Sequence, residues 1–232
     1  LLYFHGGGYA FASLHTHERL MRVLARASAA TVIGVEYRRT PEHPYPAALE
    51  DALTAWRWLA AGGAGRFGKQ RCGLFGDSAG AHLGLTLALK LRDMGEPLPD
   101  ALALAYGMYD RALTSLSHNR YGDGSYGLST ARMEWFWSQL LRRPEDCADP
   151  LANPVHADVA GLTPIAAFIA ECDCLADDTR AFLAKLAADG VPHTVDFFPK
   201  MPHGFLHLGA LVPAADTALG LVGARLAALL SG

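Results

Sequence analysis

Short uninterrupted apolar runs alternate along the chain with longer stretches in which apolar residues recur at helical spacing. The runs predict strands at Leu1–Phe4, Thr31–Tyr37, Cys72–Phe75, Ala101–Tyr106, Ile165–Ala170 and Thr194–Phe198. The stretches between them predict helices near Leu14–Ala30, Ala47–Ala61, Ala79–Arg92, Thr130–Arg142, Ala176–Asp189 and Pro213–Leu230. Because the runs are apolar at consecutive positions, we expect helices to cover both faces of the sheet. The alternation therefore predicts a mostly parallel sheet of the α/β class.

The size and charge of the chain limit its number of domains and the classes of function it could have. Its 232 residues suffice for one α/β domain, so we expect residues 1–232 to form a single domain. A formal net charge of −3, without a dense Lys/Arg run, argues against a nucleic-acid or anionic-membrane surface. No apolar run approaches the roughly 18 residues of a membrane span. The four cysteines lack the spacing of a disulfide framework or a zinc site, which favours reduced thiols in a cytoplasmic protein.

The sequence Gly-Asp-Ser-Ala-Gly at residues 76–80 follows the predicted strand Cys72–Phe75 and opens the predicted helix Ala79–Arg92. This is the context of a nucleophile elbow, a strained turn that holds a serine hydroxyl at the N-terminus of a helix. By itself the pentapeptide is more often an ordinary tight turn. The hypothesis that Ser78 is a nucleophile therefore depends on what else lies at the same edge of the sheet.

A glycine-rich loop, His-Gly-Gly-Gly at residues 5–8, follows the predicted strand Leu1–Phe4. Consecutive glycines let backbone N–H groups turn into a site and meet a developing oxyanion. A flexible loop without such a role is an equal alternative. Phosphate binding is less well supported, because neither a Walker lysine nor the G-x-G-x-x-G spacing follows.

A serine nucleophile needs a base, and ten histidines compete for that role. In parallel sheets the functional groups gather beyond the carboxyl ends of the strands. His203 follows the predicted strand Thr194–Phe198 and so lies at this edge, whereas His193 precedes the strand and lies at the opposite one. His82 points along a helix surface, and His207 is expected to support packing. The sequence His-Thr-His-Glu at residues 15–18 lacks zincin spacing and is interpreted as a solvated helix start.

The acid that orients the base should follow the predicted strand Ile165–Ala170, where four carboxylates occur. Asp177 and Asp178 fall inside the next predicted helix, where a solvated or helix-dipole role is the default. Asp173 lies in the loop itself and is the preferred acid. Glu171 directly follows the strand and is its main rival.

The chain order Ser78, Asp173, His203 is that of α/β-hydrolases. Three loops at one edge of the sheet thus offer a nucleophile, an acid and a base, and a fourth offers oxyanion donors. Each signal is modest, but their order and their common edge make the combination strong. It predicts acyl transfer through a covalent intermediate.

The chain resembles the bacterial branch of hormone-sensitive-lipase-like carboxylesterases, from residue 1 to the last predicted helix. Five stretches carry the resemblance: HGGGY, EYRRTPEHPYPAALED, GDSAG, ECDCLADD and PHGF. It implies an α/β-hydrolase fold that hydrolyses short-chain carboxylic esters without a cofactor or a metal. Carried over by position, it implies Ser78 as nucleophile, Asp173 as acid and His203 as base, with oxyanion donors at Gly6, Gly7 and Ala79.

Two other functions are compatible with these motifs. An amidase or N-deacylase would use the same three residues on a poorer leaving group. A ligand receptor on a hydrolase scaffold would bind without turnover, since fold alone does not fix function, but the retained His203 disfavours it. Short acyl chains are expected because the sequence lacks the long apolar lid helix of lipases.

The stretch 107–143 is too long for a simple connection and is expected to cover the pocket, with Trp135, Phe136 and Trp137 in its core or in the pocket wall.

The chain begins inside a predicted strand without a Met. The resemblance implies further strands and a cap upstream, which leaves room for a signal peptide. Without them Thr31–Val35 would be a bare sheet edge, so we expect a preceding segment or a second copy of the chain, as a homodimer, to cover it.

Overall fold

The computed structural model describes residues 1–63, 65, 71–209 and 211–231. These residues form a six-stranded sheet in the order β2-β1-β3-β4-β5-β6, and every neighbouring pair is parallel. The strands are β1 (Leu2–Phe4), β2 (Ile33–Val35), β3 (Gly73–Asp77), β4 (Ala101–Ala105), β5 (Ile165–Cys172) and β6 (His193–Pro202). The predicted parallel sheet is thus confirmed.

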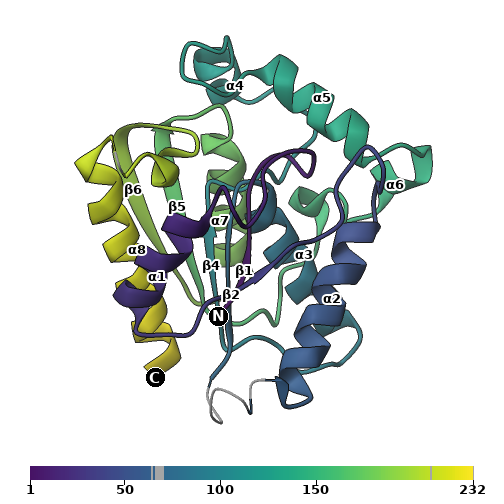
Figure 1. Ribbon diagram of the computed structural model, residues 1–232. Helices are drawn as coiled ribbons and strands as arrows, with labels where there is room; N and C mark the ends of the chain where they lie inside the picture. Colours follow the sequence, from purple (N-terminus) through teal and green to yellow (C-terminus); the bar gives the residue numbers. More distant parts are fainter. Residues whose placement is uncertain (64, 66–70, 210, 232) are drawn as a thin grey trace.

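Helices cover both faces of this sheet. They are α1 (Glu18–Ser28), α2 (Ala47–Ala60), α3 (Ala79–Asp93), α4 (Leu116–Tyr121), α5 (Thr130–Leu140), α6 (Pro144–Ala148), α7 (Ala176–Ala188) and α8 (Pro213–Ser231). Figure 1 shows α1 and α8 on one side and α2 and α3 on the other, with α4 and α5 beyond the carboxyl ends of the strands.

Side chains alternate across the strands and divide the core into two layers. In β1, Leu2 and Phe4 pack with the layer that includes Trp56 of α2 and Leu85 of α3. Tyr3 points the other way, into the layer that contains Leu24 of α1 and residues of α8. All three side chains of β1 are fully buried. This two-sided burial is the reason that the strands are apolar at consecutive positions.

The six predicted strands and six predicted helices all occur, with shifted ends. The helix expected from Leu14 begins at Glu18, because residues 14–17 form a turn. At their carboxyl ends β5 extends to Cys172 and β6 to Pro202, so the second strand stops next to His203. The stretch 107–143 contains α4, a short helix that periodicity did not predict.

Strand β2 lies at one edge of the described sheet, as predicted for Thr31–Val35 when no further strand of this chain precedes it. Whether a preceding segment or a second copy covers it stays a prediction.

By length and composition alone, α8 is apolar enough to cross a membrane. This was not predicted from the sequence, because the apolar residues of α8 do not form an uninterrupted run. One face of α8, with Ala218, Leu219 and Val222, is packed in the core against α1 and the sheet.

Candidate active site

Ser78 occupies a strained turn between β3 and α3. Its φ of 55° and ψ of −118° lie in a region that residues with a side chain seldom adopt. The strand and the helix come so close around this turn that a Cβ on Gly80 would collide with the carbonyl of Phe4, and one on Gly76 with the carbonyl of Gly80. Only glycine fits at these two positions. The predicted elbow geometry is therefore present around Ser78.

The His203 side chain lies between Ser78 and Asp173. Its Nε2 is 2.9 Å from the Ser78 Oγ, and its Nδ1 is 2.8 Å from the Asp173 Oδ2. The Asp173 side chain is fully buried, and its Oδ1 accepts the backbone N–H of Leu175 at 2.9 Å. The ring of Tyr106 packs edge-on against the His203 ring with centroids 5.0 Å apart. The acid loop, the base loop and the elbow thus converge on one imidazole.

Proton placement follows from these contacts. A carboxylate accepts hydrogen bonds only, so the His203 Nδ1 carries the hydrogen that is shared with Asp173. In a neutral ring Nε2 then has a lone pair, which can accept the Ser78 hydroxyl hydrogen. The arrangement can remove a proton from Ser78 and return it to a leaving group.

The other three carboxylates near the carboxyl end of β5 make different contacts. The Glu171 Oε2 accepts the backbone N–H of Lys200 at 2.7 Å and so ties the ends of β5 and β6 together. Asp177 accepts the N–H of Ser117 and pairs with Arg180. Of the two roles expected for Asp178, a solvated one is wrong, because its side chain is 3 % exposed and its Oδ2 accepts the N–H groups of residues 109 and 110, both at 3.0 Å. It does lie in the first turn of α7, as the helix-dipole role requires.

The glycine loop differs from expectation in its first residue. The N–H of Gly6 donates to the Asp77 Oδ1 at 3.1 Å and is therefore already engaged by a carboxylate. Gly7 has a φ of 112°, and a Cβ there would overlap the carbonyl of Phe11. Gly7 and Gly8, but not Gly6, line the pocket that contains Ser78. The hydrogen bond to Asp77 therefore disfavours Gly6 as an oxyanion donor, a role that stays a prediction.

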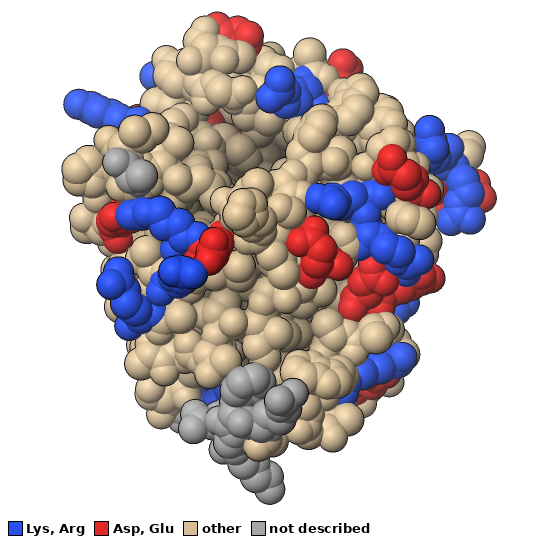
Figure 2. All heavy atoms as spheres, in the orientation of Figure 1, with Lys and Arg blue, Asp and Glu red and all other residues tan. Residues whose placement is uncertain are grey.

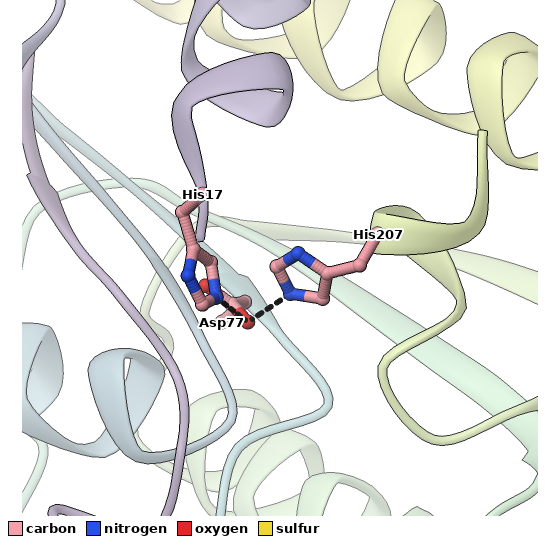
Figure 3. A group of neighbouring side chains, drawn as sticks. All are labelled: His17, Asp77 and His207. Atoms are coloured by element: carbon pink, nitrogen blue, oxygen red, sulfur yellow. Dashed lines mark hydrogen bonds and ion pairs between the residues drawn. The ribbon is translucent and has the colours of Figure 1, made fainter. Parts of the chain in front are cut away.

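A second group of side chains, which we call the His–Asp–His cluster, adjoins Ser78 and consists of His17, Asp77 and His207 (Figure 3). The Asp77 Oδ2 lies 2.9 Å from the His207 Nε2 and 3.8 Å from the His17 Nε2. Its Oδ1 accepts the Tyr3 hydroxyl at 2.6 Å. The interpretation of residues 15–18 as a solvated helix start is wrong for His17, which is 6 % exposed.

The neighbouring side chains of this cluster shift one another's pKa values. Burial raises the pKa of Asp77, but the neighbouring His207 and His17 outweigh it and hold the pKa well below its ordinary value. Burial lowers the pKa of His17, and its contact with Asp77 outweighs this and raises the pKa. Sequence reasoning missed the cluster because Asp77 was considered only as part of the elbow motif. Its place at the carboxyl end of a buried strand was the available signal.

A pocket of about 400 Å³ opens over Ser78. Its wall includes Met108, Leu128, Met133 and Phe136, all from the stretch 107–143. A hollow is visible in Figure 2 below the part of the molecule that carries α4 and α5. A larger hollow of about 660 Å³ lies on the other face of α5 and contains none of the predicted site residues.

Comparisons with known proteins agree on the family. Residues 1–207 match the family model described as alpha/beta hydrolase fold. The chain is 37 % identical over 225 residues to an ethyl acetate hydrolase of Pseudomonas putida, which covers 96 % of this chain and 70 % of that protein. It is 36 % identical over 226 residues to an acetyl-hydrolase of Streptomyces hygroscopicus, with 97 % and 74 % covered.

Solved structures give the same result. A thermostable carboxylesterase cloned from a metagenomic library superposes with a TM-score of 0.94 at 35 % identity, over 99 % of this chain and 79 % of that one. An esterase of the bacterial hormone-sensitive lipase family gives a TM-score of 0.93 at 33 % identity, over 99 % and 76 %. The chain therefore belongs to the α/β-hydrolase fold family, in its hormone-sensitive-lipase-like branch of carboxylesterases, and is a carboxylic ester hydrolase.

Proposed function

We propose that this protein is a serine carboxylesterase in which Ser78 is the nucleophile, His203 the base and Asp173 the acid. The observation that carries the proposal is the position of the His203 ring, with one nitrogen 2.9 Å from the Ser78 Oγ and the other 2.8 Å from the Asp173 Oδ2. These two contacts hold the His203 ring in one tautomer and one orientation. The strained backbone of Ser78 supports the same role.

In this mechanism the Ser78 Oγ attacks the ester carbonyl carbon while the His203 Nε2 takes its proton. Asp173 accepts the Nδ1 hydrogen throughout and stabilises the imidazolium that forms. The tetrahedral intermediate collapses when the imidazolium protonates the departing alkoxide, which leaves an acyl group on Ser78. Water, deprotonated by His203, then attacks the acyl-enzyme and releases the carboxylic acid.

The oxyanion is held by the backbone N–H groups of Gly7, Gly8 and Ala79. Gly8 replaces Gly6 in this set, because the N–H of Gly6 is already bonded to Asp77. Ala79 is the first residue of α3, where an N–H has no partner within the helix. Both Gly7 and Gly8 border the same pocket as Ser78. Donors at a helix start and in a rigid loop cost little reorganisation as negative charge develops.

Short-chain esters are the proposed substrates. The pocket over Ser78 has about 400 Å³, and the stretch 107–143 covers it with bulky side chains such as Phe136 and Met133. The names of the two relatives above refer to ethyl acetate and to acetyl groups, that is, to acyl chains of two carbons. A wall of this kind leaves room for a small acyl group next to the elbow.

The test is a series of p-nitrophenyl esters from acetate to long-chain acyl groups, measured with the wild type and with Ser78→Ala. We expect kcat/KM to be highest for the short chains. Ser78→Ala should lower turnover by about a million-fold while the folded structure is kept, because the three residues act as a unit. Near-normal turnover in Ser78→Ala would refute the mechanism. A steady rise in rate with chain length would refute the substrate assignment alone.

A further inference from the structure

The His–Asp–His cluster brings three metal-ligand side chains from separate parts of the chain to one point. His17 directly precedes α1, Asp77 ends β3, and His207 lies in the short 3-10 helix η3 (Phe205–Leu208). One ligand atom from each lies within 4.8 Å of the other two. Figure 3 shows both imidazoles directed at the same carboxylate oxygen.

The hydrogen bonds of His17 fix which of its nitrogens is available to a metal ion once the ring is neutral. Its Nδ1 lies 3.2 Å from the carbonyl oxygen of Ser13 and 2.9 Å from the Thr16 Oγ1. The Thr16 hydroxyl donates its own hydrogen to that carbonyl, so Nδ1 must be the donor to both oxygens. In a neutral ring Nε2 then carries a lone pair towards Asp77. Metal-binding histidines are held in this way, with the distal N–H on a backbone carbonyl.

Asp77 is also held as a ligand would be. Its Oδ1 is occupied by the Tyr3 hydroxyl and the Gly6 N–H, at 2.6 and 3.1 Å, and Oδ2 faces the two imidazoles. Ligands 2.0–2.1 Å from a tetrahedral ion are separated by about 3.3 Å. The observed separations from the Asp77 Oδ2, 2.9 Å to His207 and 3.8 Å to His17, bracket that value. The third separation, between the two imidazole nitrogens, is within 4.8 Å, so the side chains need to approach one another to complete the geometry.

Access and a fourth ligand are available from the pocket. All three residues of the cluster line the pocket of about 400 Å³, and the His207 side chain is 27 % exposed. An ion can therefore enter from solvent and keep a water ligand. Two imidazoles and one carboxylate form a ligand set that zinc favours.

We propose that His17, Asp77 and His207 bind a divalent transition-metal ion of the zinc type, with water from the pocket as the fourth ligand. This departs from the expectation of no metal and goes beyond ester hydrolysis. The ion would take the Asp77 oxygen that now accepts the His207 N–H. It would also place a hydrated dication in the wall of the pocket beside Ser78.

The test measures metal binding, so it is independent of whether Ser78 is the nucleophile. Protein dialysed against a chelator is titrated with Zn²⁺ by calorimetry, and with Co²⁺ by visible absorption, which reports a tetrahedral site. We expect one ion per chain and the absorption bands of a nitrogen- and oxygen-ligated Co²⁺ site. His17→Gln and His207→Gln should each weaken binding by more than about a hundredfold, since the loss of a ligand exceeds the effect of a lost outer-shell partner.

Two control variants locate the ion. His15→Gln removes an exposed imidazole two residues from His17 and should leave binding unchanged. His203→Gln should also leave it unchanged, which separates the cluster from the proposed base. Circular dichroism checks that each variant is folded. Failure of the folded wild type to bind Zn²⁺ overturns the proposal, and so does binding that survives His17→Gln and His207→Gln but is lost in His203→Gln.

Discussion

Glu171 and Asp173 lie two positions apart at the carboxyl end of β5, but their surroundings differ completely. The Asp173 side chain is fully buried and lies 2.8 Å from the His203 Nδ1, whereas Glu171 accepts a backbone N–H of the neighbouring strand. A buried carboxylate beside an imidazole stabilises the imidazolium more strongly than an exposed one, because water screens it less. We therefore expect substitution of Asp173 to lower activity much more than substitution of Glu171.

Asp173→Asn should lower kcat by about ten-thousandfold, since the amide can hold the ring but favours the wrong tautomer. Glu171→Gln keeps an acceptor for the Lys200 N–H and should change kcat by less than about tenfold. The measurement is kcat for p-nitrophenyl acetate, with thermal unfolding as the check on structure. The reverse order of effects would make Glu171 the acid.

At this scale the meeting of Asp173 and His203 could be predicted, because it depends only on which end of a strand each residue follows. The direction of the Gly6 N–H could not, since it is set by a carboxylate 71 positions away in the chain. The burial of His17 depends in the same way on Asp77 and on the ring of His207, whose centroid is 4.1 Å from its own. Such contacts leave no periodic trace in the sequence.

Among the elements, α5 separates two hollows. Met133 and Phe136 face the pocket over Ser78, whereas Trp137 and Ser138 face the larger hollow on the other side. The Phe136 ring covers the glycine loop so closely that a Cβ on Gly8 would collide with it. Helix periodicity predicted α5 itself, but which face met the pocket depended on the whole stretch 107–143, whose path has no sequence signal.

Phe136→Ala should shift acyl preference towards longer chains. Removal of the ring opens space beside the glycine loop, and each further buried methylene of a substrate is worth about 0.8 kcal/mol. We expect the ratio of kcat/KM for hexanoate over acetate to rise by roughly tenfold. Trp135→Ala is the matched control: Trp135 is 41 % exposed and is not part of the pocket wall. An unchanged ratio in Phe136→Ala would remove this ring from the acyl site.

Across the whole molecule, stability should depend on pH through Asp178, which joins α7 to the start of the stretch 107–143. Burial raises the pKa of Asp178 to about 7, against the opposing effect of the N–H groups of Asp110 and Tyr109. The carboxyl groups of Asp110 and Asp173 also face it, and its Oδ1 lies 4.0 Å from the His118 Nε2. A native group that holds its proton more tightly than the unfolded chain takes up a proton on folding.

This proton uptake determines how the free energy of unfolding changes with pH. Between pH 4 and 7, approximately, the native state binds more protons than the unfolded one, so the free energy of unfolding falls as pH rises. Below this window Asp178 is protonated in both states and carries no penalty. Asp178→Asn is neutral at every pH and keeps an oxygen for the two N–H groups. Relative to the wild type, it should therefore gain about 1–3 kcal/mol of stability between pH 4.5 and 8.

Urea unfolding at four pH values across that range measures the difference. Asp177→Asn is the matched control, since burial raises the pKa of Asp177 but its contacts with Arg180 and Ser117 outweigh this and lower it. The stability contributed by Asp177 is lost only as pH falls below the ordinary carboxyl range, so its variant should differ from the wild type by a constant amount from pH 5 to 8. A constant difference for Asp178→Asn as well would mean that Asp178 is ionised in the native protein throughout. The two N–H groups, and not burial, would then control its charge.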